Sequence, residues 1–285
     1  MTTRRIALCT WSDPSYVDPE PPQIATALRG RGLEAEVVVW HDEVDWASFD
    51  LVVIRSTWDY FDRLEEFIDW ADRVHSVSRI VNSPRVIRWN SHKGYLAELG
   101  EAGIPVLPSL ALAKGAAHPV DRMLAAGWAD VVIKPAVDGG ARGALKAPAA
   151  SPEAADHLGR LVEAGDTIVQ PYAASVESGE VSVFFFGGAF SHAVRKIPRA
   201  GDYRVQALHG GAEVVHKPTA AELDLAQRAM ALAPDELVYA RVDLIDVDGS
   251  PTLMELELIE PDLFLRMAPG AVDAFAVAVA AQLAR

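Results

Sequence analysis

RVDLIDVDGSPTLMELELIEP (residues 241–261) is the segment of this chain with the clearest structural pattern. Two runs of alternating apolar and polar residues flank an Asp-Gly dipeptide, which is typical of a two-residue hairpin turn. Residues two apart on a strand share a face, so Glu255 and Glu257 project together, and the hairpin brings Asp243 close to their level. Three crowded carboxylates repel one another and favour a divalent cation, and hard oxygen ligands without nearby His or Cys favour magnesium. The alternative interpretation is an ordinary hairpin whose charged face is in water, since it would have the same sequence pattern.

The composition limits the classes of protein to consider. With 285 residues, half of them hydrophobic, the chain can bury a substantial core. A net charge of -14 without runs of Lys or Arg argues against a nucleic-acid partner. Cys9 is the only cysteine, which excludes an intrachain disulfide, and we find neither a signal peptide nor a long apolar segment. We therefore expect a cytoplasmic enzyme with no membrane partner.

The first part of the chain has the pattern of a small open α/β sheet. Apolar runs at residues 4–9, 33–40 and 50–56 predict strands, and a helix is expected from about Gln23. In such sheets the ligand crevice lies beyond the carboxyl ends of the strands. Two loops leave those ends, TWSDPSY at residues 10–16 and RSTWDY at residues 55–60.

These loops supply the candidate substrate residues. Arg55 is a cation able to grip a carboxylate with two hydrogen bonds. Hydroxyl side chains and an acid lie in the same loops, and Arg266, after the hairpin, is a second candidate clamp. The full set of candidate substrate residues is Ser12, Asp13, Arg55, Ser56, Thr57 and Arg266. Ser56 or Thr57 as the N-cap of the helix expected at residues 61–74 is the alternative interpretation.

VVIKPAVDGGARG (residues 131–143) is the second informative segment. Lys134 ends a predicted strand, and the loop after it contains Gly139, Gly140 and Gly143. Because this loop has few side chains, its backbone N–H groups are free to close on phosphate oxygens, and Arg142 adds a positive charge. The segment matches neither GxxxxGK[ST] nor GxGxxG, and a glycine-rich hairpin turn is the alternative.

Further polar residues have weaker individual signals. Lys93 begins a predicted helix, where an anion would also meet backbone amides. The segment Gln170-Pro171-Tyr172 ends a strand and could present backbone groups to an adenine edge, with Glu177 near a ribose; Glu180 is also in range. The neighbours Arg195 and Lys196 lie on a predicted strand, so only one of them can readily enter a site.

The order of these parts resembles the ATP-grasp superfamily, in particular the branch of glutathione synthetases and ribosomal-protein glutamate ligases. The resemblance covers nearly the whole chain. It implies a fold of α/β and α+β parts in three units: an N-terminal open α/β substrate-side domain at residues 1–88, a small ATP-grasp subdomain with a glycine-rich lid at 89–168, and a C-terminal subdomain with the metal site at 169–285.

The resemblance also implies roles for individual residues. It places ATP phosphates at Lys93 and Lys134 beneath a lid at residues 139–143, and adenine at residues 170–172 with Glu177 at the ribose. Two Mg²⁺ ions would be held by Asp243, Glu255 and Glu257; the last position is often Asn in this family. Charge on the transferred phosphoryl group would be neutralised by Arg142 and by Arg195 or Lys196.

The implied activity is that of an ATP-dependent carboxylate–amine ligase, which works through an acyl phosphate. The N-terminal loops resemble those of compact ATP-grasp cyclo-ligases that close O-ureido-D-serine into the antibiotic D-cycloserine, which makes a small amino-acid-like molecule the expected partner. An intermolecular amino-acid or peptide ligase and a non-catalytic ATP-binding module are the alternatives. A dehydrogenase is disfavoured because GxGxxG is missing after the first strand. The sequence leaves the oligomeric state open, a homo-oligomer included.

Overall fold

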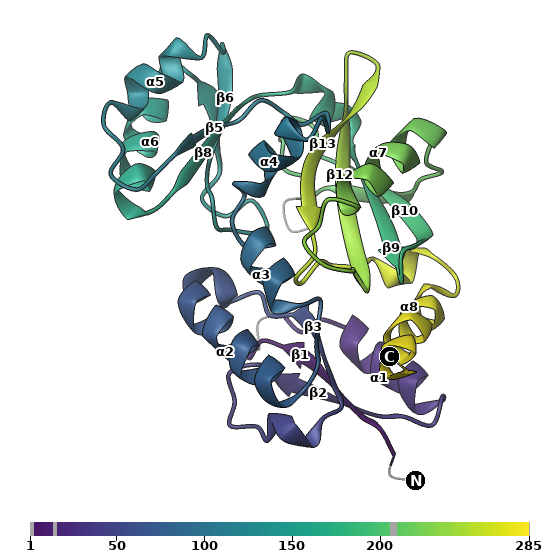
Figure 1. Ribbon diagram of the computed structural model, residues 1–285. Helices are drawn as coiled ribbons and strands as arrows, with labels where there is room; N and C mark the ends of the chain where they lie inside the picture. Colours follow the sequence, from purple (N-terminus) through teal and green to yellow (C-terminus); the bar gives the residue numbers. More distant parts are fainter. Residues whose placement is uncertain (1–2, 14–15, 206–209, 285) are drawn as a thin grey trace.

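The computed structural model describes residues 3–13, 16–205 and 210–284. These residues form three sheets, each in its own part of the molecule (Figure 1). The N-terminal sheet lies at one end, the middle sheet lies at the other, and the largest sheet is beside them. None of the described helices is both long and apolar enough to cross a membrane.

The N-terminal sheet is parallel, with strand order β2-β1-β3-β4. Its buried strands are flanked by helices, as the sequence pattern predicts. Its elements are β1 (Arg5–Thr10), α1 (Glu20–Arg29), β2 (Glu34–Val39), η1 (Trp46–Ser48), β3 (Leu51–Ser56), η2 (Tyr60–Asp62), α2 (Leu64–Val77) and β4 (Ile80–Val81). Helix α1 begins before Gln23 because two prolines occupy its first turn, where a missing N–H costs nothing. Helix α2 begins at Leu64, so neither Ser56 nor Thr57 caps it.

A short helix follows β4. Helix α3 (Pro84–Asn90) begins with a proline, and the Ser83 hydroxyl accepts a hydrogen bond from the Val86 N–H. This serine cap and N-terminal proline are an ordinary helix start. The domain boundary expected after residue 88 therefore falls inside a helix.

The middle sheet is antiparallel, with strand order β5-β8-β6-β7, and α5 and α6 pack on it. Its elements, together with the preceding helix, are α4 (Tyr95–Glu101), β5 (Leu110–Leu112), α5 (Pro119–Ala125), β6 (Asp130–Pro135), β7 (Leu145–Pro148), α6 (Pro152–Ala164) and β8 (Thr167–Pro171). Strand β8 belongs to this sheet along its whole length, so the boundary expected at residue 168 divides a strand.

The C-terminal sheet is antiparallel, with strand order β11-β10-β9-β12-β13. Its elements are η3 (Ala174–Ser178), β9 (Glu180–Phe186), β10 (Ala189–Ile197), β11 (Ala212–Val215), α7 (Ala220–Met230), β12 (Tyr239–Val247), β13 (Ser250–Glu257), η5 (Leu265–Met267), α8 (Ala271–Ala280) and η6 (Ala281–Ala284). The hairpin expected at residues 241–261 is confirmed as β12 and β13. Its turn residues Asp248 and Gly249 have φ of 51° and 81°, as a tight primed turn requires.

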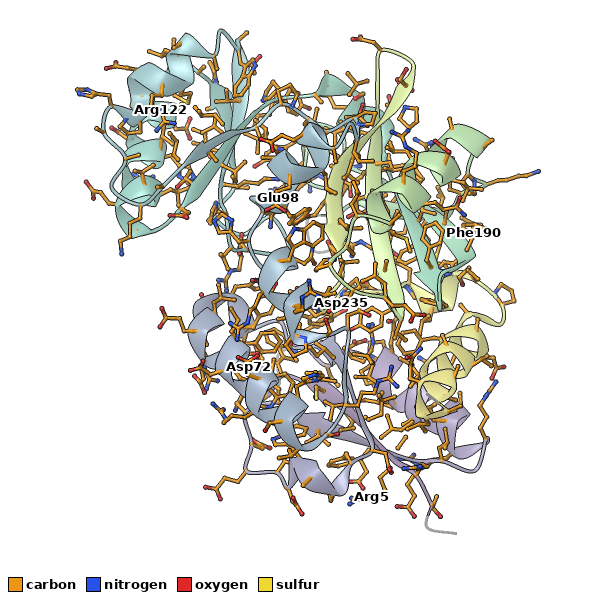
Figure 2. The ribbon with its side chains drawn as sticks, viewed as in Figure 1. Arg5, Asp72, Glu98, Arg122, Phe190 and Asp235 are labelled. Carbon is orange, nitrogen blue, oxygen red and sulfur yellow. The ribbon has the colours of Figure 1, made fainter. Side chains whose placement is uncertain are left out.

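One hydrophobic core joins the two ends of the chain. It combines Ile6 and Ile24 of the N-terminal domain with Phe184 of β9 and Phe275 of α8. Helix α8 lies beside α1 (Figure 1), and side chains fill the space between the N-terminal and C-terminal sheets (Figure 2). This shared core holds the carboxyl ends of β1 and β3 against the segment that follows β13.

Candidate active site

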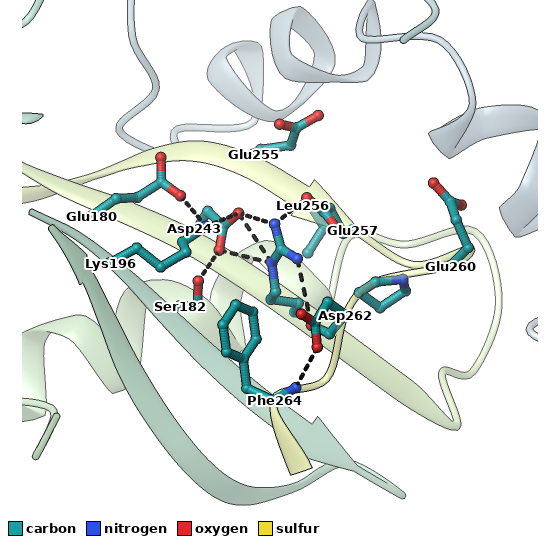
Figure 3. Close-up of polar contacts among 12 residues, drawn as sticks. Glu180, Ser182, Lys196, Asp243, Glu255, Leu256, Glu257, Glu260, Asp262 and Phe264 are labelled. Carbon is teal, nitrogen blue, oxygen red and sulfur yellow. Dashed lines mark hydrogen bonds and ion pairs between the residues drawn. The ribbon is translucent and has the colours of Figure 1, made fainter. Parts of the chain in front are cut away.

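A row of charged side chains crosses one face of the C-terminal sheet. Asp243 is directly opposite Glu255 on β13, and on the other side it is opposite Ser182 of β9. Arg241 is opposite Glu257, and Glu180 is opposite Lys196 of β10. Because side chains alternate along a strand, these register pairs place all the groups on one face (Figure 3). The prediction that Asp243 lies at the level of the two glutamates is confirmed.

Arg241 is a member of this row that the sequence analysis missed. Its Nη2 donates to Asp243 Oδ2 at 2.8 Å and also contacts Glu257 Oε1. Burial raises the pKa of Asp243, but Arg241 and Lys196 outweigh burial and hold the pKa well below its usual range. Burial raises the pKa of Glu257 to about 7 although Arg241 opposes the change. The available signal was the alternation itself, since Arg241 lies two residues before Asp243.

Two lysines reach the row from outside the C-terminal sheet. Lys93 lies between α3 and α4, and its Nζ is 3.0 Å from Glu255 Oε1. Lys134 is on β6, and its pKa is lowered mainly by burial and further by the charge of Lys93. Burial would raise the pKa of Glu255, but Lys93 and then Lys134 outweigh it, and the pKa falls. The structure therefore brings both predicted phosphate lysines to the carboxylates.

Lys196 and Arg195 point to opposite sides of β10. Lys196 is buried, its Nζ is 3.2 Å from Asp243 Oδ2, and it also contacts Glu180. Arg195 instead lies over Gly179 and contacts the Ser178 carbonyl at 3.5 Å. Lys196 is therefore the member of this pair that enters the row.

The carboxylates do not by themselves form a ready-made metal cluster. Within the described part of the chain, no three Asp, Glu, His or Cys side chains converge as metal ligands. Arg241 occupies the space between Asp243 and Glu257, and Lys93 contacts Glu255. The donor set is nevertheless suited to Mg²⁺, because three carboxylates on adjacent strands supply hard oxygens on one face.

The expected adenine segment lies at the end of β8. The buried Gln170 donates to Ser109 Oγ at 2.9 Å, and the Tyr172 hydroxyl donates to Glu177 Oε1 at 2.7 Å. Lys146 Nζ lies 3.4 Å from the centroid of the Tyr172 ring, a contact the sequence analysis missed. Pro171 links Gln170 and Tyr172 at the end of the strand. Glu177 is thus exposed and bound to Tyr172, whereas Glu180 is buried in the charged row.

The glycine-rich loop between β6 and β7 contacts three other parts of the molecule. The Asp138 carbonyl accepts a hydrogen bond from Lys93 Nζ, and the Gly143 carbonyl lies 2.9 Å from His157 Nε2. Gly140 and Gly143 have φ of 64° and 65°, a conformation that glycine adopts without strain. Gly139 packs against Phe61 and Arg142 pairs with Asp62, both in the N-terminal domain.

The substrate candidates of the N-terminal domain gather at the carboxyl ends of β1 and β3. The Ser56 and Thr10 hydroxyls lie 2.9 Å apart. The exposed Ser12 Oγ lies 3.3 Å from His41 Nε2, and Asp13 is exposed nearby in sequence. Thr57 Oγ1 is buried and has no hydrogen-bond partner among the described residues. Residues 14–15 of the first loop lie outside the described residues.

Arg55 and Arg266 have surroundings that differ from those of an open carboxylate clamp. Arg55 is fully buried, and its Nη2 donates to the Pro261 carbonyl at 2.9 Å and to Glu20 Oε2 at 3.2 Å. Arg266 is half exposed and pairs with Glu213. The Arg55 guanidinium thus joins the N-terminal domain to the segment after β13, a role that the sequence analysis did not foresee.

Asp18 is a polar residue of this region that the sequence analysis also missed. It is only 7% exposed, and its Oδ2 has no hydrogen-bond partner among the described residues. Burial raises the pKa of its carboxyl, although the charge of Arg55 opposes the change. A buried carboxylate in a proline-rich loop has no distinctive sequence pattern.

Comparison with known proteins separates the chain into two matched regions. Residues 6–82 match the family described as D-cycloserine synthetase DcsG, N-terminal domain. Residues 115–266 match the prokaryotic glutathione synthetase, ATP-grasp domain.

Whole-chain relatives agree with both matches. The cycloserine biosynthesis protein DcsG of Streptomyces lavendulae is 35% identical, over 98% of this chain and 98% of its own length. The glutathione synthetase of Bordetella pertussis is 25% identical, over 79% of this chain and 70% of that protein.

Solved structures give the same result. The crystal structure of D-cycloserine synthetase DcsG superposes with a TM-score of 0.88 at 32% identity, covering 98% of this chain and 99% of that one. A D-alanine–D-alanine ligase from Bacillus anthracis shares the fold, with a TM-score of 0.72 at 16% identity over 99% and 98% of the two chains. The ATP-grasp fold implied by the resemblance is confirmed, and the chain belongs to the ATP-grasp family of ATP-binding, carbon–nitrogen bond-forming ligases, in the group that contains D-cycloserine synthetase.

Proposed function

We propose that this ligase closes O-ureido-D-serine into D-cycloserine, with release of ADP, phosphate, carbon dioxide and ammonia. The observation that carries the proposal is that similarity to D-cycloserine synthetase spans the N-terminal domain as well as the ATP-grasp domain. We take the N-terminal domain as the substrate side, so that a match there bears on the substrate, whereas a match in the ATP-grasp domain bears only on ATP chemistry.

The reaction needs two transfers. The substrate carboxylate attacks the γ-phosphate of ATP, which gives an acyl phosphate and ADP. The nitrogen bonded to the side-chain oxygen then attacks the acyl carbon, phosphate leaves, and the five-membered ring closes. Hydrolysis of the carbamoyl group on that nitrogen yields carbon dioxide and ammonia. The protein needs no nucleophile of its own for either transfer.

The charged row supplies electrostatic stabilisation for both transfers. Lys93 and Lys196 are buried cations held in place by carboxylates, and Lys134 is half-buried near them, so little reorganisation is needed when negative charge develops nearby. Arg241, held by Asp243 and Glu257, adds a fourth cation at the same face. Closure of the glycine-rich loop would keep water from the acyl phosphate.

ATP and magnesium fit the groups that the fold gathers. Asp243, Glu255 and Glu257 would hold two Mg²⁺ ions, and Gln170 to Tyr172 would face the adenine. When bound, the metal would neutralise charge on the phosphate oxygens. Of the two candidate ribose acids, Glu180 lies in the charged row, and we assign the ribose contact to it in place of Glu177. Asp18, Ser56 and Thr57 would face the polar substrate.

The test is incubation of the protein with ATP, Mg²⁺ and a panel of amino acids that contains O-ureido-D-serine and its L-form. We expect phosphate release with O-ureido-D-serine and a product whose mass equals that of D-cycloserine. Phosphate release with another panel member and an intermolecular product would identify an amino-acid ligase. ATP binding without phosphate release for any member would contradict the proposed substrate and favour a binding module.

Neighbouring residues on β10 provide a matched pair for a second prediction. Lys196→Met should lower ATP-dependent phosphate release by about 100-fold or more, because it removes a buried cation aimed at the reacting phosphates. Arg195→Met, which alters the opposite face of the same strand, should change the rate by less than about threefold. Steady-state rates of both variants check this expectation. Equal losses in the two would contradict the assignment of Lys196.

A further inference from the structure

The glycine-rich loop between β6 and β7, called the lid below (residues 139–143), is held by the N-terminal domain through two contacts. Arg142 Nη1 and Nη2 lie 3.0 and 2.7 Å from Asp62 Oδ2 and Oδ1, a two-pronged arrangement. Two parallel charged hydrogen bonds fix direction as well as distance, which a single contact between long side chains does not. The Arg142 bond lowers the pKa of the Asp62 carboxyl.

The second contact needs glycine at residue 139. A Cβ placed on Gly139 would lie 2.3 Å from Phe61 Cζ, closer than real atoms approach. The backbone of the lid therefore rests directly on the Phe61 ring. Phe61 and Asp62 are neighbours in the short helix η2 (Tyr60–Asp62), so a single element makes both contacts.

The Arg142 guanidinium is directed toward Asp62 in this structure. Its Nη1 and Nη2 both bond to Asp62, and its Nε lies 3.4 Å from Asp138 Oδ1. The lysines near the charged row, in contrast, contact Glu255 and Asp243. The arginine of the lid thus faces the N-terminal domain, whereas the cations suited to the phosphates come from other elements.

We propose that Phe61 and Asp62 form a dock for the lid, and that Arg142 is a positioning residue that acts by closing the lid on this dock. The candidate substrate residues Ser56, at the end of β3, and Thr57, in the loop between β3 and η2, lie a few positions before the dock. The dock therefore connects closure over the nucleotide to the loop that faces the proposed substrate. This inference rests on ATP binding by the site and is independent of which amino acid is activated.

Dissociation of a fluorescent ADP analogue in the presence of Mg²⁺ tests the dock. Asp62→Asn and Arg142→Gln should each raise the dissociation rate by about two- to fivefold, the range of an exposed ion pair. The double variant should be no faster than either single variant, because both changes break the same contact. Asp72→Asn is the matched control, since Asp72 on α2 also pairs with an exposed arginine, Arg88, but lies away from the lid (Figure 2).

If Arg142 touched the phosphates itself, Arg142→Gln would accelerate dissociation far more than Asp62→Asn, and the double variant would show the product of the two effects. That result would overturn the proposal. Unchanged rates in Asp62→Asn would also overturn it.

A measurement without nucleotide separates failure of the dock from failure of the proposed function. Trypsin cleaves after arginine, and Arg142 lies in the exposed lid. Cleavage after Arg142 should be several-fold faster in Asp62→Asn than in the unaltered protein, with Asp62→Glu intermediate and Asp72→Asn unchanged. Equal cleavage in all four proteins would refute the dock even if the enzyme makes D-cycloserine.

Discussion

Glu255→Gln should lower ATP-dependent turnover by about 100- to 1,000-fold or more, the scale of losing one preorganised charge in an active site. Glu255 contacts Lys93 and lies within the electrostatic influence of Lys134, so its loss removes the anion that pairs with Lys93 and changes the charge around Lys134. Burial lowers the pKa of Lys93, and Glu255 is the main group that raises it above the usual value. The variant should therefore lose the carboxylate partner of Lys93 together with a proposed magnesium ligand.

The measurement is phosphate release at increasing Mg²⁺, with product detected by mass. We expect the variant to require more Mg²⁺ and to remain slow at saturation. Glu66→Gln is a suitable control, because Glu66 is exposed and pairs with Arg63, which is not a member of the charged row. Turnover in Glu255→Gln equal to that of this control would sink the assignment of the site.

Arg55→Met should lower the free energy of unfolding by about 3–5 kcal/mol at pH 8, as expected when one partner of a buried ion pair is removed. Arg55 is completely buried, donates to Glu20 and to the Pro261 carbonyl, and lies 5.3 Å from the centroid of the Phe275 ring. Its removal leaves the Glu20 carboxylate in the core without a cation.

The loss should be smaller at pH 5.5. Burial raises the pKa of Glu20 from 4.5 to about 7, even though Arg55 acts to lower it. A carboxyl whose pKa is raised by folding stabilises the folded state fully below pH 4.5, and this contribution is lost as the pH rises through 7. Without Arg55 the folded pKa rises further, so the penalty in the variant grows with pH.

Urea unfolding at the two pH values measures this difference. Arg88→Met is the control, since Arg88 and Asp72 are each 47% exposed, and such a pair contributes at most about 1 kcal/mol. A loss in Arg55→Met that does not depend on pH would rule out the stranded carboxylate as its cause.

Local sequence patterns were sufficient for most elements because their causes lie within a few residues. The alternation on both sides of Asp248-Gly249 determines which residues share a face, and the turn sets the register as far as Leu244 opposite Leu253. A register shift between Asp243 and Leu244 then brings Asp243 opposite Glu255. Helix α3 was not among the expected elements, although its Ser83 cap and N-terminal proline are visible in the sequence.

The choice between neighbours needed the tertiary structure. Alternation along the strand predicts that Arg195 and Lys196 point to opposite faces of the sheet. Only the position of β10 beside β9 shows that Lys196 is on the same face as Asp243. The expected clamp Arg55 is another example. The sequence around Arg55 is typical of an open loop, yet α8 and the segment after β13 pack over this side chain and bury it completely.

The sequence thus predicted the charged hairpin, because the alternation and the turn that define it act between near neighbours. The resemblance to a known family supplied the expectation of three units and of the groups that meet ATP. Local rules of this kind could not predict the contact between Arg142 of the lid and Asp62. Arg142 and Asp62 are 80 residues apart, and each is an ordinary exposed charge in its own segment. They meet only in the folded molecule, where the loop between β6 and β7 packs against helix η2, and the packing of distant elements determines which separated charges become partners.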